Sequence, residues 1–130
     1  FYYIKPNQLN PWSDYHLSFN LGYPNKYDRA QGYTGNYLMI HGSCVSIGCY
    51  AMTDETIEEL WTIASKALEQ GQPFFRVHSS PFPLTNEKLE TFKNNKNYAF
   101  WKNLQEGYFY FENNKTPPNV DLVNKKYVFS

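Results

Sequence analysis

The sequence has no net charge at pH 7, only two cysteines and no long apolar run. Its 12 basic and 12 acidic residues cancel at pH 7, so no cationic surplus exists to neutralise phosphates, which argues against nucleic acid as a partner. Two cysteines are too few for a disulfide scaffold, and no metal-ligand spacing surrounds them. No apolar run reaches membrane-spanning length. We therefore expect no metal, no cofactor and no transmembrane segment.

An initiator Met and a leader-like segment are also missing, and the chain opens on a strand-like run, Phe1-Tyr2-Tyr3-Ile4. We interpret the chain as a processed protein or a fragment, so this absence says nothing against export. Aromatic residues are abundant instead, with 12 Tyr, 10 Phe and 3 Trp. Many tyrosines suit carbohydrate or peptide clefts, but a β-rich composition is the favoured explanation.

Hydrophobic periodicity and chain breakers predict a mixed fold of several short strands and few helices. A length of 130 residues fits one domain. Residues 25–36 are polar and contain two glycines, which predicts a loop. We expect strands at 1–4, 15–21, 37–40, 73–78 and 108–111, a hairpin over 120–129, and helices at 53–70, 86–93 and 98–106, the last closed by Gly107.

The helix over residues 53–70 carries the strongest signal. Thr53 or Asp54 can cap it, and its first turns are acidic, which favours the helix dipole. One apolar stripe runs along it, and Gly71 follows as a stop. The stripe contains Ile57, Leu60, Trp61, Ala64, Ala67 and Leu68. This predicts one long helix directly behind Cys49.

The stretch from Leu38 to Asp54 places a histidine, His41, at the end of an apolar strand and a cysteine, Cys49, just before that helix. A thiol becomes a useful nucleophile as thiolate, and an adjacent imidazole can accept its proton. Gly48 lets the backbone approach a substrate carbonyl, and the N–H groups of Gly48, Cys49 and Tyr50 could form an oxyanion hole.

Other interpretations of these two residue types stay open. A cysteine near a histidine is more often structural, because buried cysteine behaves as a small hydrophobe. Cys44 is the rival nucleophile, and a disulfide between Cys44 and Cys49 would switch such a site off. We favour Cys49, because it follows a glycine and precedes the helix.

The same stretch resembles the signature of the L,D-transpeptidase catalytic domain (YkuD-type) family, in which a His-Gly element follows a strand and Ser-x-Gly-Cys leads into a helix. Position by position, the resemblance makes His41 the base and Cys49 the acylated nucleophile, and it places Ser46 and Gly48 in the nucleophile turn. Runs such as Gly22-Tyr23-Pro24-Asn25 and Cys49-Tyr50-Ala51-Met52-Thr53-Asp54 resemble a periplasmic murein L,D-transpeptidase and amidase subgroup. Ile47 stands where the usual signature has a second histidine, and the gap from His41 to Cys49 is shorter.

The resemblance implies an α+β, predominantly β fold, with a YkuD-like β-sandwich or barrel-like sheet, one long helix after the cysteine, and short helices. Residues 1–130 are then a single catalytic domain that lacks part of its N-terminal region. The implied reaction is L,D-transpeptidation of diaminopimelate-containing peptidoglycan stem peptides through a Cys49 thioester, in the periplasm or cell envelope.

Two alternatives accompany that function. One is a cysteine amidase of the same fold that hydrolyses murein L,D-cross-links or releases murein-bound lipoprotein. The other is a non-catalytic module that binds the cell wall.

Several further residues are candidates for substrate binding beside the His41-Gly42 element. His16 could face the cleft, although a hydrogen-bonded structural histidine is the more common case. Arg29 or Arg76 could bind a carboxylate, although an ordinary ion pair is the safer interpretation. Tyr23, Tyr33 and Tyr50 could line a sugar or peptide groove, or could simply pack.

Overall fold

The computed structural model describes residues 1–46 and 48–130, so Ile47, the departure from the family signature, lies outside the described residues. The chain divides into two compact units, Phe1–Val77 and His78–Ser130. The expectation of a single catalytic domain lacking part of its N-terminal region stays a prediction. Within the described ranges, no helix is both long enough and apolar enough to cross a membrane.

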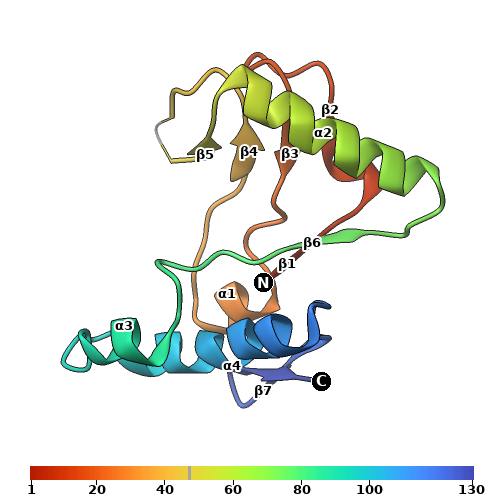
Figure 1. The fold of residues 1–130 in the computed structure, drawn as a ribbon. Helices are drawn as coiled ribbons and strands as arrows, with labels where there is room; N and C mark the ends of the chain where they lie inside the picture. Colours follow the sequence, from red (N-terminus) through yellow and green to blue (C-terminus); the bar gives the residue numbers. More distant parts are fainter. Residues whose placement is uncertain (47) are drawn as a thin grey trace. The chain divides into compact units, whose positions relative to one another are not determined.

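The first unit contains a four-stranded sheet in the order β2-β3-β4-β5 (Figure 1). Neighbouring strands are antiparallel except for the parallel pair β4 and β5. A separate antiparallel pair joins β1 to β6. The strands are β1 (Tyr2–Ile4), β2 (Leu9–Asn10), β3 (Ser18–Asn20), β4 (Met39–His41), β5 (Tyr50–Ala51) and β6 (Phe75–Val77); the helical segments are η1 (Pro6–Gln8), α1 (Lys26–Ala30) and α2 (Asp54–Glu69).

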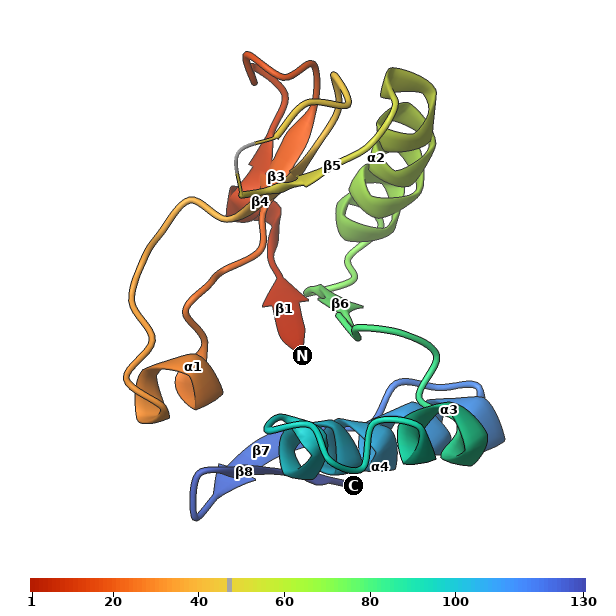
Figure 2. The ribbon, with the colours of Figure 1, turned by 90° about the vertical axis from the view of Figure 1, so that its left-hand side faces the viewer.

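Helix α2 lies along one face of the four-stranded sheet (Figure 2). Thr53 is its N-cap, with the hydroxyl accepting a hydrogen bond from the Thr56 N–H, as the sequence predicts. Ile57 is fully buried and belongs to one apolar cluster with residues of the strands. That cluster contains Ile4, Phe19, Leu21, Ile40 and Ile57. The core of this unit therefore sits between α2 and one side of the sheet.

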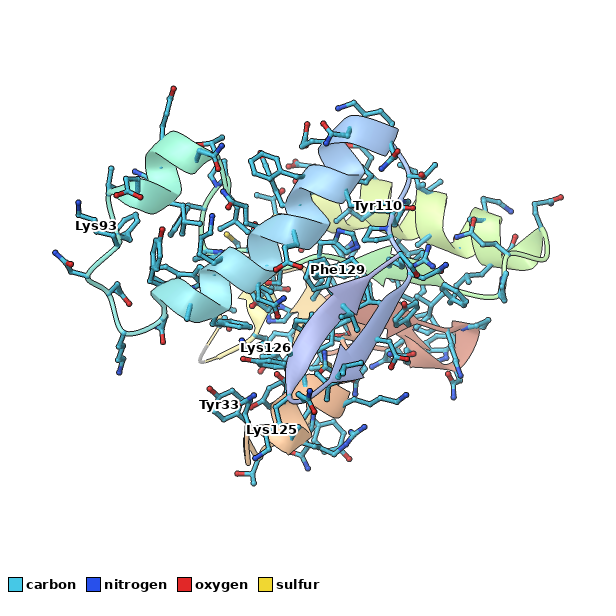
Figure 3. The ribbon with its side chains drawn as sticks, turned by 90° about the horizontal axis from the view of Figure 1, so that it is seen from below. Tyr33, Lys93, Tyr110, Lys125, Lys126 and Phe129 are labelled. Atoms are coloured by element: carbon cyan, nitrogen blue, oxygen red, sulfur yellow. The ribbon has the colours of Figure 1, made fainter. Side chains whose placement is uncertain are left out.

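The second unit combines helices α3 (Asn86–Glu90) and α4 (Tyr98–Asn114) with the hairpin β7 (Val120–Val123) and β8 (Lys126–Phe129) (Figure 3). The Asn103 side chain of α4 binds β8 at two points. Its amide N–H donates to the Tyr127 carbonyl at 2.9 Å, and its oxygen accepts from the Tyr127 N–H at 2.8 Å. This pair of bonds fixes the hairpin against the helix.

Two predictions about local structure are wrong. Helix α4 runs through Gly107 to Asn114, so the strand expected at 108–111 does not form. Gly107 is buried, and helix packing outweighs the weak helix propensity of one glycine. The expected loop over 25–36 contains α1, because Asn25 and Asp28 cap it reciprocally.

The coarse prediction of a mixed fold of helices and strands is confirmed. The expected predominance of strands is wrong, because helices hold more of the described residues than strands do. There are also two long helices, α2 and α4, where one was expected. The strands form open sheets, and the finer expectation of a YkuD-like sandwich or barrel-like sheet stays a prediction.

Candidate active site

His41 ends β4 and is only 2% exposed. It pairs with Ser18 of β3, as expected of a histidine delivered by a buried strand. Its Nδ1 lies 2.6 Å from the carbonyl oxygen of Gly42. Because a carbonyl oxygen can only accept, Nδ1 carries the proton in this contact. In the neutral imidazole, Nε2 is then the proton acceptor, which is the atom a general base needs.

The ring of Tyr15 covers the imidazole of His41. The two ring centroids are 4.7 Å apart, and the ring planes are tilted by 39°. Tyr15 is 41% exposed, so it lies between His41 and solvent on one side. The sequence analysis missed this residue, because nothing in the local pattern indicates which ring will reach His41.

Cys49 immediately precedes β5, and the strand register places it on the same side of the sheet as His41. The parallel pair aligns Ile40 with Tyr50 and His41 with Ala51. Side chains alternate along a strand, so Cys49 shares the side of Ala51, which is also the side of His41. Cys49 is partly exposed, and its Sγ donates to the Tyr37 carbonyl at 3.5 Å, so the thiol's hydrogen bond goes to that carbonyl and not to the imidazole.

The turn before Cys49 is closed by its own hydrogen bonds. The Ser46 hydroxyl donates to the Cys49 carbonyl at 2.7 Å and accepts from the Gly48 N–H at 3.0 Å. The Gly48 N–H, one of the expected oxyanion donors, is therefore engaged inside the turn. Ser46 thus has a clear local role, which is to hold the backbone on either side of the thiol.

The base of the same loop is tied to β4 and to the start of α2. The Met52 N–H donates to the His41 carbonyl at 2.9 Å, and the Cys44 N–H donates to the Met52 carbonyl at 3.0 Å. The Asp54 carboxylate accepts from the Ser43 N–H at 2.6 Å. The first turn of α2 therefore positions the loop that carries both cysteines. Cys44 is exposed, and both thiols are free in the structure.

The other candidate residues mostly have structural partners. His16 Nε2 lies 2.6 Å from Glu58 Oε1 on α2, which fits the structural interpretation. Arg29 donates to the Pro24 carbonyl through Nη1. The Tyr23 hydroxyl donates to the Thr34 carbonyl at 3.3 Å. Tyr50 remains 48% exposed beside Cys49. A substrate-binding role for any of these residues stays a prediction.

An apolar hollow of about 410 Å³ lies on the α2 side of the sheet and does not include the site. Its lining comes from the core side of the strands and from α2, including Ile40, Met52, Leu60 and Ile63. His41 and Cys49 are on the other side of their strands. Among the described residues, no cluster of three His, Cys, Asp or Glu side chains could hold a metal ion.

The two glycines of the site differ in the space around them. A Cβ on Gly42 would lie 2.8 Å from Asp54 Oδ1, 2.9 Å from Ile57 Cγ2 and 3.0 Å from the Tyr15 carbonyl oxygen. A Cβ on Gly48 would meet no atom within 4 Å. Gly42 is therefore required for close packing of the loop against α2, whereas the described atoms around Gly48 leave room for a side chain.

Gly42→Ala is expected to lower the free energy of unfolding by about 1–3 kcal/mol, the usual effect of overpacking. Gly48→Ala is the matched control and is expected to change it by less than about 0.5 kcal/mol. Urea denaturation of the two variants beside the wild type measures both values. Equal destabilisation by the two changes would contradict the packing described for Gly42.

Comparison with known proteins finds relatives that share one name. No family model matches the chain. Two proteins named "Putative L,D-transpeptidase YafK", from Escherichia coli strain K12 and from E. coli O157:H7, are each 48% identical to it over 130 residues. These residues are 100% of this chain and 53% of each relative, so the chain spans about half the length of the curated relatives it matches. Identity of this degree along the whole chain supports its assignment to the L,D-transpeptidase family.

Proposed function

We propose that the chain carries a cysteine acyl-transfer centre that acts on peptidoglycan stem peptides, with Cys49 as nucleophile and His41 as base. The observation that carries this proposal is the hydrogen bond from His41 Nδ1 to the Gly42 carbonyl, 2.6 Å long. This bond leaves Nε2 of His41 as the proton acceptor. The strand register puts His41 and Cys49 on the same side of the sheet. The name of the relatives supports peptidoglycan as the substrate.

The chemistry follows from these roles. Nε2 of His41 takes the proton of the Cys49 thiol, and the thiolate attacks an amide carbonyl of the stem peptide. The C–N bond breaks, the leaving amine takes the proton from His41, and a thioester remains on Cys49. An acceptor amine then attacks the thioester, restoring the thiol and forming a new amide. The proposal places this reaction in the periplasm or cell envelope, where peptidoglycan is exposed.

A second candidate is hydrolysis at the same thioester. Cys49 is partly exposed, and the residues on either side of it in the described turn, Ser46, Gly48 and Tyr50, are exposed. Water can therefore reach the thioester as well as an amine can. The enzyme would then be an amidase that trims murein cross-links or releases a lipoprotein bound to murein. A non-catalytic wall-binding module is the remaining alternative.

Product analysis separates these functions. Purified protein incubated with muropeptides is expected to give new cross-linked dimers, resolved by liquid chromatography and mass spectrometry. Freed amines without new dimers would establish the amidase instead. Intact-protein mass spectrometry during turnover is expected to find a stem-peptide adduct on Cys49 in either case. Unchanged muropeptides together with an unmodified protein would refute both enzymatic functions.

A further inference from the structure

Tyr37 is an exposed aromatic residue in a backbone conformation that favours glycine or asparagine. Its φ is 54°, and its side chain is 71% exposed. A bulky L-residue in the left-handed region costs free energy, and an exposed ring recovers little of it through packing. Tyrosine at this position therefore lacks an explanation from stability alone.

The surrounding hydrogen bonds hold Tyr37 in this conformation. The Leu21 N–H donates to the Leu38 carbonyl at 2.9 Å, directly after Tyr37. The Tyr23 hydroxyl donates to the Thr34 carbonyl at 3.3 Å, three residues before it. The Tyr37 carbonyl itself accepts from the Cys49 thiol at 3.5 Å. Residues in strained conformations that their neighbours enforce occur preferentially at functional sites.

The segments that border the thiol contain no charged residue. Arg29 is the last charged residue before them and Asp54 the first after them, so residues 30–53 carry no Lys, Arg, Asp or Glu. At 18% charged residues in the whole chain, an even distribution would give a segment of this length several. Residues 30–53 thus offer rings, hydroxyls and amides but no charged Lys, Arg, Asp or Glu side chain, which favours a neutral ligand.

Two further tyrosines among residues 30–53 are exposed. Tyr33 is 53% exposed, and Tyr50 is 48% exposed, although strand alternation turns Tyr50 to the side opposite Cys49. The stacking role therefore falls to Tyr37, whose carbonyl accepts from the Cys49 thiol. An exposed tyrosine offers a flat apolar face and a hydroxyl at its edge, a combination that suits the apolar face and hydroxyl rim of a pyranose ring. Charged stem-peptide groups, in contrast, would find no complementary charge among residues 30–53.

We propose that Tyr37 is a saccharide-stacking residue beside Cys49, which binds a neutral N-acetylated sugar of the glycan to which the stem peptide is attached. The proposal rests on the proposed function for its substrate class. It assigns the recognition of the neutral glycan to the Tyr37 ring and leaves the reacting amide to Cys49. Strain at Tyr37 is then retained because the ring binds substrate.

The test compares Tyr37→Asn, which removes the ring and suits the left-handed conformation, with Tyr37→Phe, which keeps the ring. The probe is N,N′-diacetylchitobiose, titrated into the full chain and followed by changes in NMR amide shifts. Tyr37→Asn is expected to weaken sugar binding about 3- to 10-fold, and Tyr37→Phe to stay near wild type. The thermal midpoint of Tyr37→Asn is expected to equal or exceed that of the wild type. Sugar affinity unchanged by Tyr37→Asn, or no binding to the wild type, would overturn the proposal.

Lys125→Gly is the matched control for strain. Lys125 occupies the turn between β7 and β8 with a φ of 61°, another non-glycine residue in the left-handed region, and is labelled in Figure 3. Glycine suits this position of a two-residue hairpin turn, so the change is expected to raise the midpoint and leave sugar binding unchanged. Loss of sugar binding in Lys125→Gly would show that the titration responds to changes far along the chain from Tyr37, which would overturn the assignment of the sugar to the Tyr37 ring.

Turnover provides the second arm and separates this proposal from the proposed function. Tyr37→Asn is expected to raise KM about 3- to 10-fold on a disaccharide-peptide and to leave KM unchanged on the same stem peptide without sugar. Equal losses on both substrates would mean that the ring contacts peptide, which would overturn the sugar assignment. If the wild type turns over neither substrate, the proposed function fails, and the chitobiose titration still decides the role of Tyr37.

Discussion

Cys49→Ala is expected to abolish turnover of muropeptides, with a loss of at least about 10³-fold in kcat, because it removes the sulfur on which the proposed thioester forms. The change removes only a sulfur that is partly exposed and donates to the Tyr37 carbonyl. The fold should therefore persist, and the thermal midpoint should shift little. Product analysis by liquid chromatography gives the rate, and circular dichroism gives the midpoint.

Cys44→Ala is the control for that result. Cys44 is exposed, and it contributes to the loop through its backbone N–H, which alanine keeps. Turnover in this variant should stay within a fewfold of wild type. An equal loss in both variants would reverse the ranking of the two thiols. Retained turnover in Cys49→Ala would instead exclude the thioester mechanism altogether.

The parts of the fold that could be predicted are those with a local signal. Helix α2 follows from an apolar stripe and a threonine cap, and the structure ends it within a residue of the prediction. The sequence predicts that helix α4 ends at Gly107, because a glycine indicates a helix end and its burial is not visible in the sequence. Lys115, at a φ of 56°, ends that helix instead, and nothing in the local pattern predicts a left-handed lysine.

The candidate site also has parts that local sequence predicts and parts that it does not. His41 at the end of an apolar strand was predictable, because β4 carries a continuous apolar run. Strand β5 has only two residues, too few to show any periodicity. The register that puts Cys49 and His41 on one side of the sheet could therefore not be predicted. The stacking of Tyr15 on His41 depends on how β3 pairs with β4, which local sequence does not specify.

Loop geometry connects stability to function in this unit. Ser43 and Cys44 both have positive φ, at 61° and 41°, so the chain turns sharply directly after His41-Gly42. The Asp54 carboxylate accepts the Ser43 N–H at 2.6 Å, and Gly42 leaves no room for a side chain against the same carboxylate. Helix α2 thus stabilises the turn that brings the cysteine loop back to β4. A defect at Gly42 should therefore reduce both stability and turnover.

Replacement of His41 tests the other half of the mechanism. His41→Asn keeps an N–H donor close to the position of Nδ1, so the Gly42 carbonyl retains its partner, but it has no basic nitrogen. His41→Ala removes both features and leaves a buried carbonyl unsatisfied. Both variants are expected to lose about 10²–10⁴-fold in kcat, the usual contribution of a general base. Only His41→Ala should also lose stability, by about 1–3 kcal/mol.

The comparison of the two variants separates chemistry from structure. Turnover of muropeptides gives the rates, and urea denaturation gives the free energies of unfolding. Because the imidazole is buried and its Nδ1 bonds to the Gly42 carbonyl, a purely structural histidine would let His41→Asn keep most of the activity together with the stability. A stable His41→Asn variant without activity therefore identifies Nε2 as the base, whereas a stable and active one would remove His41 from the reaction and leave it as support for the loop.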